Sequence, residues 1–346
     1  MAEPAVITGS ASVTSAITCF GGTATVTITA SGGTAPLSYT FNGVTNSTGI
    51  FAGITAGAAY SWNVTDANNC GPFTGTLAVT QPALLTGLAT ITTPVQCFGG
   101  NATVTLNSAG GTAPVSYTFN GVTNTTGIFT GIPAGTGYAW SITDAASCGP
   151  VTGTLNVLQP QPITGSAAVT VPVPCNGATG TVRITGAGGT APLSYTLNGT
   201  TNTTGIFTGI TAGSGYLWSI NDANGCSPAT GIIDVTQPSL LTGSATVTAE
   251  IICYGGTATV SLSGSGGTAP LSYTFNGVTN STGIFAGIPA GTAYPWSITD
   301  AANCGPVTGT LDVLQPSQLI ASAAVSAEVV CTGGTATVTL TAAGGT

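Results

Sequence analysis

A long internal repeat constrains this chain more than any other feature. The segment from Tyr60 to Cys70 returns at 138–148, 216–226 and 294–304 with the same spacing of tyrosine, tryptophan, acidic residue and cysteine. Four equally spaced tryptophans keep this register without an insertion: Trp62, Trp140, Trp218 and Trp296. Self-similarity at a fixed period indicates a tandem array of small domains rather than one large fold.

The period predicts where the domains lie. We expect four complete repeats, at 4–82, 83–160, 161–238 and 239–316. Residues 317–346 repeat only the first two strands of a fifth, and two strands cannot enclose a core. Because no secretion signal precedes the first repeat, we expect the chain to be a fragment of a longer protein.

Apolar and polar residues alternate with period two inside each repeat, which is typical of half-buried strands. In the first repeat we read six strands, at residues 7–14, 24–30, 37–41, 49–54, 60–65 and 74–79. Glycine, proline and asparagine separate them, and no segment has helical periodicity. The prediction is an all-β fold: a tandem array of small β-sandwich modules like immunoglobulin or fibronectin III domains. Short proline-containing linkers would hold the modules as an elongated rod.

Two aromatic positions of each repeat are expected in the core. The tryptophans named above should fill the centre of each sandwich. The tyrosine two residues before each tryptophan follows a glycine-containing corner, where a tyrosine corner would let its hydroxyl bond to upstream backbone. These tyrosines are Tyr60, Tyr138, Tyr216 and Tyr294.

Nine cysteines follow the same period, separated alternately by a longer and a shorter interval. No Cys-x-x-Cys pair and no histidine accompany them, which argues against zinc, iron–sulfur or thioredoxin-like chemistry. With six antiparallel strands, the loop before the second strand and the loop after the fifth open at the same end of a module. This predicts one disulfide inside each repeat and an unpaired Cys331. The predicted pairs are Cys19–Cys70, Cys97–Cys148, Cys175–Cys226 and Cys253–Cys304. Disulfides indicate an extracellular compartment.

Composition excludes several functions. Only 3% of residues are charged and Arg183 is the single cation, so a phosphate backbone has almost nothing to pair with and no nucleic acid is expected as a partner. No apolar run reaches the length of about 18 residues that suggests a membrane-spanning helix, so we expect no membrane insertion.

One aspartate precedes the second cysteine of every repeat. These residues are Asp66, Asp144, Asp222 and Asp300. We expect each to form an Asx turn or to end its strand; calcium is the alternative, but one aspartate and a nearby asparagine supply too few oxygen ligands. No pair of acids recurs in every repeat, and neither histidine nor lysine is present to activate a nucleophile. We therefore predict no catalytic residue, no metal site, no cofactor and no enzymatic activity.

Four motifs recur in a fixed order: Gly-Gly-Thr-Ala-Pro-Leu-Ser-Tyr-Thr-Phe at 32–41, Ala-Gly-x-x-Tyr at 56–60, Thr-Asp-Ala-Asn-x-Cys at 65–70 and Gln-Pro at 81–82. Together they resemble the SprB-type repeat, over nearly all of residues 4–316. That family is known from very large surface proteins of gliding and related Bacteroidota, exported by the type IX system and forming long adhesive filaments. The resemblance implies a cell-surface stalk or filament, with gliding and the export route carried by analogy.

Three functions remain open at this point. The first is a non-enzymatic stalk or filament of a large adhesin, with a surface polysaccharide or an abiotic surface as its partner. The second is a carbohydrate-binding array, in which the residue after the first cysteine contacts the ligand; the aromatic residues in that position are Phe20, Phe98 and Tyr254. The third is a filament subunit that self-associates, because charges that protect edge strands are scarce.

Overall fold

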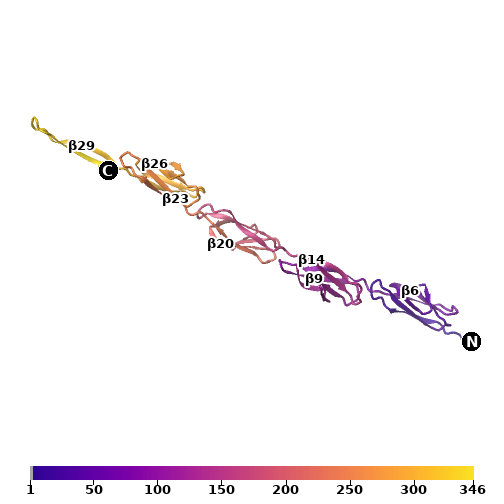
Figure 1. Cartoon of the computed structure of the whole chain (residues 1–346). Helices are drawn as coiled ribbons and strands as arrows, with labels where there is room; N and C mark the ends of the chain where they lie inside the picture. The colour runs from indigo at the N-terminus through magenta and orange to yellow at the C-terminus, as the bar shows by residue number, and fades with distance from the viewer. Residues whose placement is uncertain (1–2) are drawn as a thin grey trace. The chain divides into compact units, whose positions relative to one another are not determined.

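The computed structural model describes residues 3–346, which contain thirty β-strands and no helix (Figure 1). Seven strands recur four times, and each group of seven is called a module below. Module 1 consists of β1 (Thr8–Ser15), β2 (Ala24–Ser31), β3 (Ser38–Phe41), β4 (Val44–Asn46), β5 (Ile50–Ile54), β6 (Gly57–Thr65) and β7 (Phe73–Val79). Module 2 consists of β8 (Thr86–Thr93), β9 (Asn101–Ala109), β10 (Ser116–Phe119), β11 (Val122–Asn124), β12 (Ile128–Pro133), β13 (Gly135–Thr143) and β14 (Val151–Val157).

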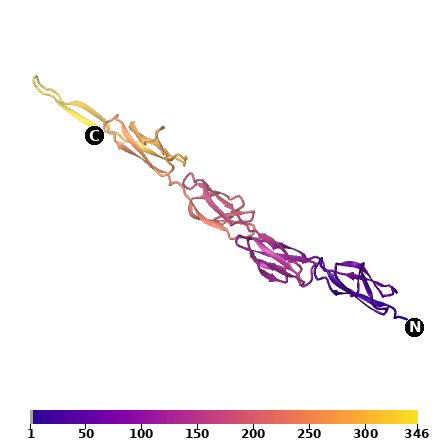
Figure 2. The ribbon, with the colours of Figure 1, turned by 45° about the vertical axis from the view of Figure 1, so that its right-hand side comes forward.

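The remaining strands repeat this order. Module 3 consists of β15 (Thr164–Val171), β16 (Thr179–Ala187), β17 (Ser194–Leu197), β18 (Thr200–Asn202), β19 (Ile206–Thr211), β20 (Gly213–Asn221) and β21 (Ala229–Val235). Module 4 consists of β22 (Thr242–Ala249), β23 (Ala258–Ser265), β24 (Ser272–Phe275), β25 (Val278–Asn280), β26 (Ile284–Ile288), β27 (Gly291–Thr299) and β28 (Val307–Val313). The last two strands, β29 (Ser317–Ala327) and β30 (Thr337–Gly345), form a separate two-stranded sheet, drawn in yellow in Figure 2.

Each module is a sandwich of two antiparallel sheets, as the alternating pattern predicted. In module 1, β1, β2 and β5 form a three-stranded sheet in the order β1-β2-β5, and the other four strands form a sheet in the order β4-β3-β6-β7. Modules 2 to 4 have the same two sheets. The chain is therefore a tandem array of immunoglobulin-like β-sandwich modules. Contacts divide it into two compact units between Pro162 and Ile163, with two modules in each. The five ranges expected from the period, at 4–82, 83–160, 161–238, 239–316 and 317–346, stay predictions as domain borders.

The core of each module lies between the two sheets. In module 1, Val26 and Val64 are fully buried and Phe41 is 1% exposed. The ring of Phe41 lies 5.4 Å from that of Tyr60 and 5.6 Å from that of Phe51, between centroids. Phe41 and its counterparts therefore occupy the centre that was predicted for tryptophan. Those counterparts are Phe119, Leu197 and Phe275.

The tryptophans pack beside this centre, against a cross-strand glycine. Trp62 is buried and pairs with Gly75 on β7, where a Cβ atom would lie 2.6 Å from the indole. The other three tryptophans are half-buried at the margin of their cores, each over the equivalent glycine. Glycine at this position leaves room for the indole, which a Cβ atom on the paired residue would clash with.

The tyrosines form the predicted corners. The Tyr60 hydroxyl donates a hydrogen bond to the Thr55 carbonyl at 3.1 Å, five residues upstream. The other modules repeat the bond, from Tyr138 to Pro133, from Tyr216 to Thr211 and from Tyr294 to Pro289. Each tyrosine packs against the core of its own module, half-buried. The corner thus ties the loop before β6 to the strand itself.

One strand per module was missed by the six-strand interpretation. After Phe41, Asn42 and Gly43 turn the chain with φ of 47° and 83°, and the short strand β4 then pairs with β3. Asn and Gly tolerate these left-handed angles, so a tight hairpin forms here. A three-residue strand is too short to show alternation in the sequence, and for this reason the pattern did not reveal it.

Candidate functional site: the junction between modules

The missed strand decides which loops lie at the same end of a module. With seven strands, the β1–β2 loop that carries Cys19 opens at the end where β7 finishes, and the β6–β7 loop that carries Cys70 opens at the opposite end. The hydrogen bonds confirm this division. Gly21 in the first loop donates to the side chain of Gln81 just after β7, whereas Thr34, between β2 and β3, donates to Asp66 in the second. We call these the C-terminal end and the N-terminal end of a module.

The cysteine loop at the C-terminal end is built by its own backbone and by the linker. In module 1 the Gly22 N–H donates to the Cys19 carbonyl at 2.9 Å, which closes a tight turn. The Gly21 N–H donates to Gln81 Oε1 at 2.8 Å. The same glutamine clamp occurs in each later module, from Gly99 to Gln159, Gly177 to Gln237 and Gly255 to Gln315. The glutamine therefore holds the start of the linker against the cysteine loop.

The glutamines were missed as functional residues. The sequence showed only a Gln-Pro pair that ends the last strand. Their recurrence at the same position of every repeat was the available signal.

The cysteine loop at the N-terminal end is built around a buried aspartate. Asp66 is 4% exposed, and its Oδ2 accepts a hydrogen bond from the Thr34 N–H at 3.0 Å. Its Oδ1 accepts from the N–H groups of Asn68 and Cys70, at 3.0 and 2.8 Å. The bond to Asn68 is the predicted Asx turn, and the bond to Cys70 fixes the backbone that carries the thiol.

These hydrogen bonds keep the aspartate ionised. The backbone N–H of Thr34, followed by that of Cys70, lowers the pKa of Asp66 below its ordinary value, against the opposing effect of burial. In the other modules the pKa of the equivalent aspartate is lowered in the same way, mainly by the N–H of the cysteine four residues later. No cluster of three or more possible metal ligands occurs within residues 3–346.

Disulfides join the C-terminal end of one module to the N-terminal end of the next. Cys19 of module 1 is bonded to Cys148 of module 2, with 5.3 Å between their Cα atoms. Cys175 of module 3 is bonded to Cys304 of module 4, with 5.5 Å between their Cα atoms. Both pairs are 129 residues apart in the sequence.

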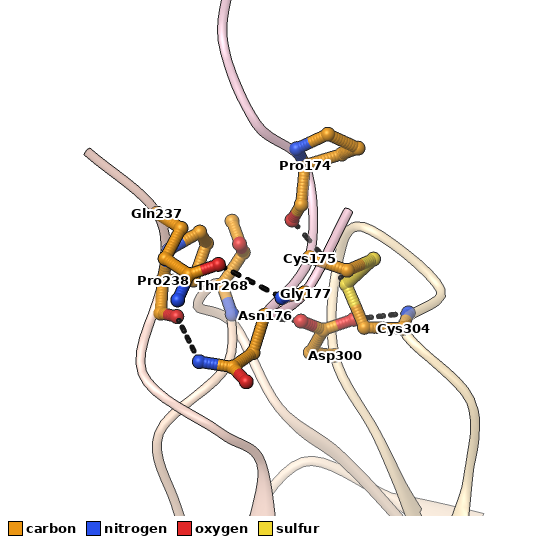
Figure 3. The surroundings of a disulfide bond; sticks show 9 residues. All are labelled: Pro174, Cys175, Asn176, Gly177, Gln237, Pro238, Thr268, Asp300 and Cys304. Carbon is orange, nitrogen blue, oxygen red and sulfur yellow. Dashed lines mark hydrogen bonds between the residues drawn. A yellow bond between two sulfur atoms is a disulfide. The ribbon is translucent and has the colours of Figure 1, made fainter. Parts of the chain in front are cut away.

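Figure 3 shows the second of these junctions. Asp300 accepts from the N–H groups of Thr268 and Cys304, at 2.8 Å each, and so positions one sulfur. On the opposing loop, the Asn176 amide donates to the Pro238 carbonyl at 3.2 Å. The Cys304 sulfur lies 3.3 Å from the Pro174 carbonyl oxygen; being bonded to sulfur it carries no hydrogen, so this is a close contact.

The predicted pairing inside each repeat is wrong at all four places. Cys70 and Cys253 are free thiols, which removes the pairs Cys19–Cys70 and Cys253–Cys304. Cys148 is bonded to Cys19 and Cys175 is bonded to Cys304. These bonds exclude the predicted pairs Cys97–Cys148 and Cys175–Cys226. The physical reason is the missed strand, because one additional strand moves the second cysteine to the other end of its module. Cys331 is a free thiol, as predicted.

The residue after the first cysteine lies at the junction. Phe20, 52% exposed, lines a cavity of about 350 Å³ together with Cys19, Leu84, Asp144 and Cys148. Phe98 and Tyr254 are 57% and 53% exposed. The structure thus places Phe20 at a contact between modules, and ligand binding by these aromatic residues stays a prediction.

The comparisons with known proteins identify the repeat. The model of the SprB repeat matches residues 11–46, 89–124 and 167–202, each running from the first strand of a module to the end of its fourth. These segments are SprB repeats, as the resemblance predicted, although the motifs at 56–70 and 81–82 lie outside the matched segments. The matches support a cell-surface, adhesin-like repeat protein, structural rather than enzymatic. Together with the disulfides they indicate an extracellular location. No curated protein matches the chain.

Several solved structures are similar to the chain. The N-terminal eight Ig domains of Down Syndrome Cell Adhesion Molecule match with 13% identity and a TM-score of 0.28, over 99% of this chain and 52% of that one. Invasin, a bacterial integrin-binding protein, matches with 14% identity and a TM-score of 0.32, over 93% and 82%. Three N-terminal domains of the bacteriophage RB49 Highly Immunogenic Outer Capsid protein match with 11% identity and a TM-score of 0.33, over 90% and 99%.

The chain spans about half the length of the eight-domain structure. Because these TM-scores and identities are low, the fold assignment rests on the strands and their order. In residues 3–346 there is no helix able to cross a bilayer.

Proposed function

We propose that this chain is a section of the stalk of a large cell-surface adhesin, in which disulfides carry tension from one module to the next. The observation that supports this most directly is the link between successive modules, Cys19–Cys148 and Cys175–Cys304. Each of these two pairs of modules is connected twice, once through the peptide linker and once through sulfur. Two separate attachments restrict rotation at a junction far more than a single linker does.

The loops closed by these bonds would also resist extension. Pulling on the two ends of the chain cannot lengthen the residues enclosed between two bonded cysteines, because the force passes through the sulfur atoms. Each loop encloses most of two modules. A stalk built in this way would keep its reach under load, which suits a molecule that holds a cell to a polysaccharide or to an abiotic surface. Export by the type IX system and a role in gliding belong to the same proposal.

Surface exposure and adhesion test this function. In cells that produce the protein, an antibody against these modules should label intact cells, and a deletion of the modules should reduce attachment. Labelling that requires cell lysis, or unchanged attachment of the deletion strain to every surface tried, would overturn the proposal.

A further inference from the structure

Module 3 has a cavity on the side where β18 and β19 are the edge strands of its two sheets. The cavity has a volume of about 470 Å³, within the range of about 300–1,000 Å³ that is usual for ligand pockets. Leu197 and Phe207 in its wall are buried, whereas Asn198, Thr200 and Thr208 are exposed. The wall therefore combines an apolar floor with a polar rim.

The floor differs from the repeat at one position. Modules 1, 2 and 4 have a phenylalanine where module 3 has Leu197. In module 1 the ring of Phe41 lies 5.4 Å from that of Tyr60, between centroids. Leucine is shorter and has no ring, so less of the space beside Tyr216, the equivalent of Tyr60, is filled. Tyr216 is half-buried and lines the cavity.

The rim differs from the repeat as well. Thr200 stands where the other modules have valine, at Val44, Val122 and Val278. Those valines are 62–63% exposed, so the core does not depend on this position. Both departures lie on the wall of the same cavity. One leaves it more room and the other makes it more polar.

The polar side chains of the rim have unused hydrogen-bonding groups. Within residues 3–346, no hydrogen bond to another residue reaches the side chains of Asn198, Thr200 or Thr208. The Asn198 backbone N–H donates to the Leu217 carbonyl at 2.8 Å, which fixes the turn that carries the amide. An amide offers donors and an acceptor, and each hydroxyl can donate and accept. These groups suit a ligand that itself carries hydroxyl groups.

The wall is also uncharged. None of the residues that line the cavity is acidic or basic, and Arg183, the single cation, is not among them. An ionic ligand would lose its hydration there without gaining a charged partner. A neutral sugar fits better, because its hydroxyl groups can bond to the rim while its C–H face packs on the apolar floor.

We propose that this cavity of module 3 binds a short segment of a neutral polysaccharide. The floor around Leu197 and Tyr216 receives the C–H face of a sugar ring, and Asn198, Thr200 and Thr208 bind its hydroxyl groups. The inference rests on the adhesin function proposed above for the source of the sugar. It adds to that function the class of polysaccharide and the module that holds it.

Calorimetric titration of the purified full chain with maltotriose, cellotriose, mannotriose and xylotriose tests the site. At least one of them should bind, with one site per chain. Leu197→Phe combined with Thr200→Val restores the residues of the other modules and should weaken binding at least tenfold. The double variant should fold, because the other modules accommodate phenylalanine there at 1% exposure. Unchanged urea unfolding would verify this.

A second variant removes only a polar group. Asn198 has a φ of 45°, which glycine adopts freely, so Asn198→Gly should keep the turn and weaken binding about tenfold. The matched control is Asn276→Gly at the same turn of module 4, which should bind as the unsubstituted chain does.

Several results would overturn the sugar site: no binding of any of the four trisaccharides, four equal sites per chain, or unchanged affinity in Asn198→Gly or in the double variant. These results leave the adhesin function to its own test, the attachment of the deletion strain. Unchanged attachment of that strain, with trisaccharide binding intact, would overturn the adhesin function and leave the sugar site standing.

Discussion

The pairing of cysteines between modules predicts opposite outcomes for two serine substitutions. Cys148→Ser removes the bond to Cys19, whereas Cys70→Ser changes a thiol that has no partner. If pairing were within a repeat, Cys70→Ser would break a bond to Cys19. Cys70→Ser is therefore the discriminating variant, and Cys148→Ser is its positive control.

The magnitude follows from the size of the closed loop. In the chain-entropy model, a loop of 129 residues contributes about 5 kcal/mol to the free energy of unfolding. The shorter loop between Cys19 and Cys70 would contribute about 4 kcal/mol. We expect Cys148→Ser to lower the stability of modules 1 and 2 by up to about 5 kcal/mol. Cys70→Ser should change stability by less than about 0.5 kcal/mol, as exposed substitutions usually do.

Urea unfolding without reductant, combined with thiol counting, provides the assay. Cys148→Ser should expose one additional thiol relative to the unsubstituted chain, and peptide mapping should identify it as Cys19. Cys70→Ser should lose one thiol. The pairing between modules would be refuted if Cys70→Ser lowered the free energy of unfolding by several kcal/mol, or if Cys148→Ser freed Cys97. Either result would also refute the conclusion that the two cysteine loops of a seven-stranded module lie at opposite ends.

Three further predictions follow from the modules. Because folding lowers the pKa of Asp66, its ionised carboxylate stabilises the fold. This contribution is complete at a pH above the ordinary pKa of 3.8, and it is lost as the pH falls through the lower pKa of the folded chain. The melting temperature should therefore stay level above about pH 5 and drop in acid, and Asp66→Asn should weaken that dependence; a level profile down to about pH 2 would contradict this. Gly75→Ala places a Cβ atom 2.6 Å from the Trp62 ring and should cost about 1–3 kcal/mol in urea unfolding, whereas the exposed neighbour Thr76→Ala should cost less than about 0.5 kcal/mol. In single-molecule pulling from both ends, reduction of Cys19–Cys148 and Cys175–Cys304 should release the two loops of 129 residues that they close, about 900 Å of contour, compared with about 700 Å for pairing within repeats. Equal extension with and without reductant would argue against any load-bearing disulfide.

The sequence by itself determined the local structure of this protein. The repeat period, strands with alternating burial such as β2, and the Asn42-Gly43 turn all depend on neighbours in the chain or on simple recurrence, and each was predictable. The tyrosine corner and the Asx turn at Asp66 bridge only five and two residues, so they were predictable too.

Only the tertiary structure decided which cysteines meet. The pairing depends on the number of times the chain reverses between Cys19 and Cys70, and the three-residue strand β4 changes that number by one. Such a strand is defined by its pairing with β3, which alternation over three residues cannot reveal. The same holds for the centre of the core. Phe41 and Trp62 lie opposite each other on neighbouring strands, and only the packing of the two sheets places the phenylalanine innermost.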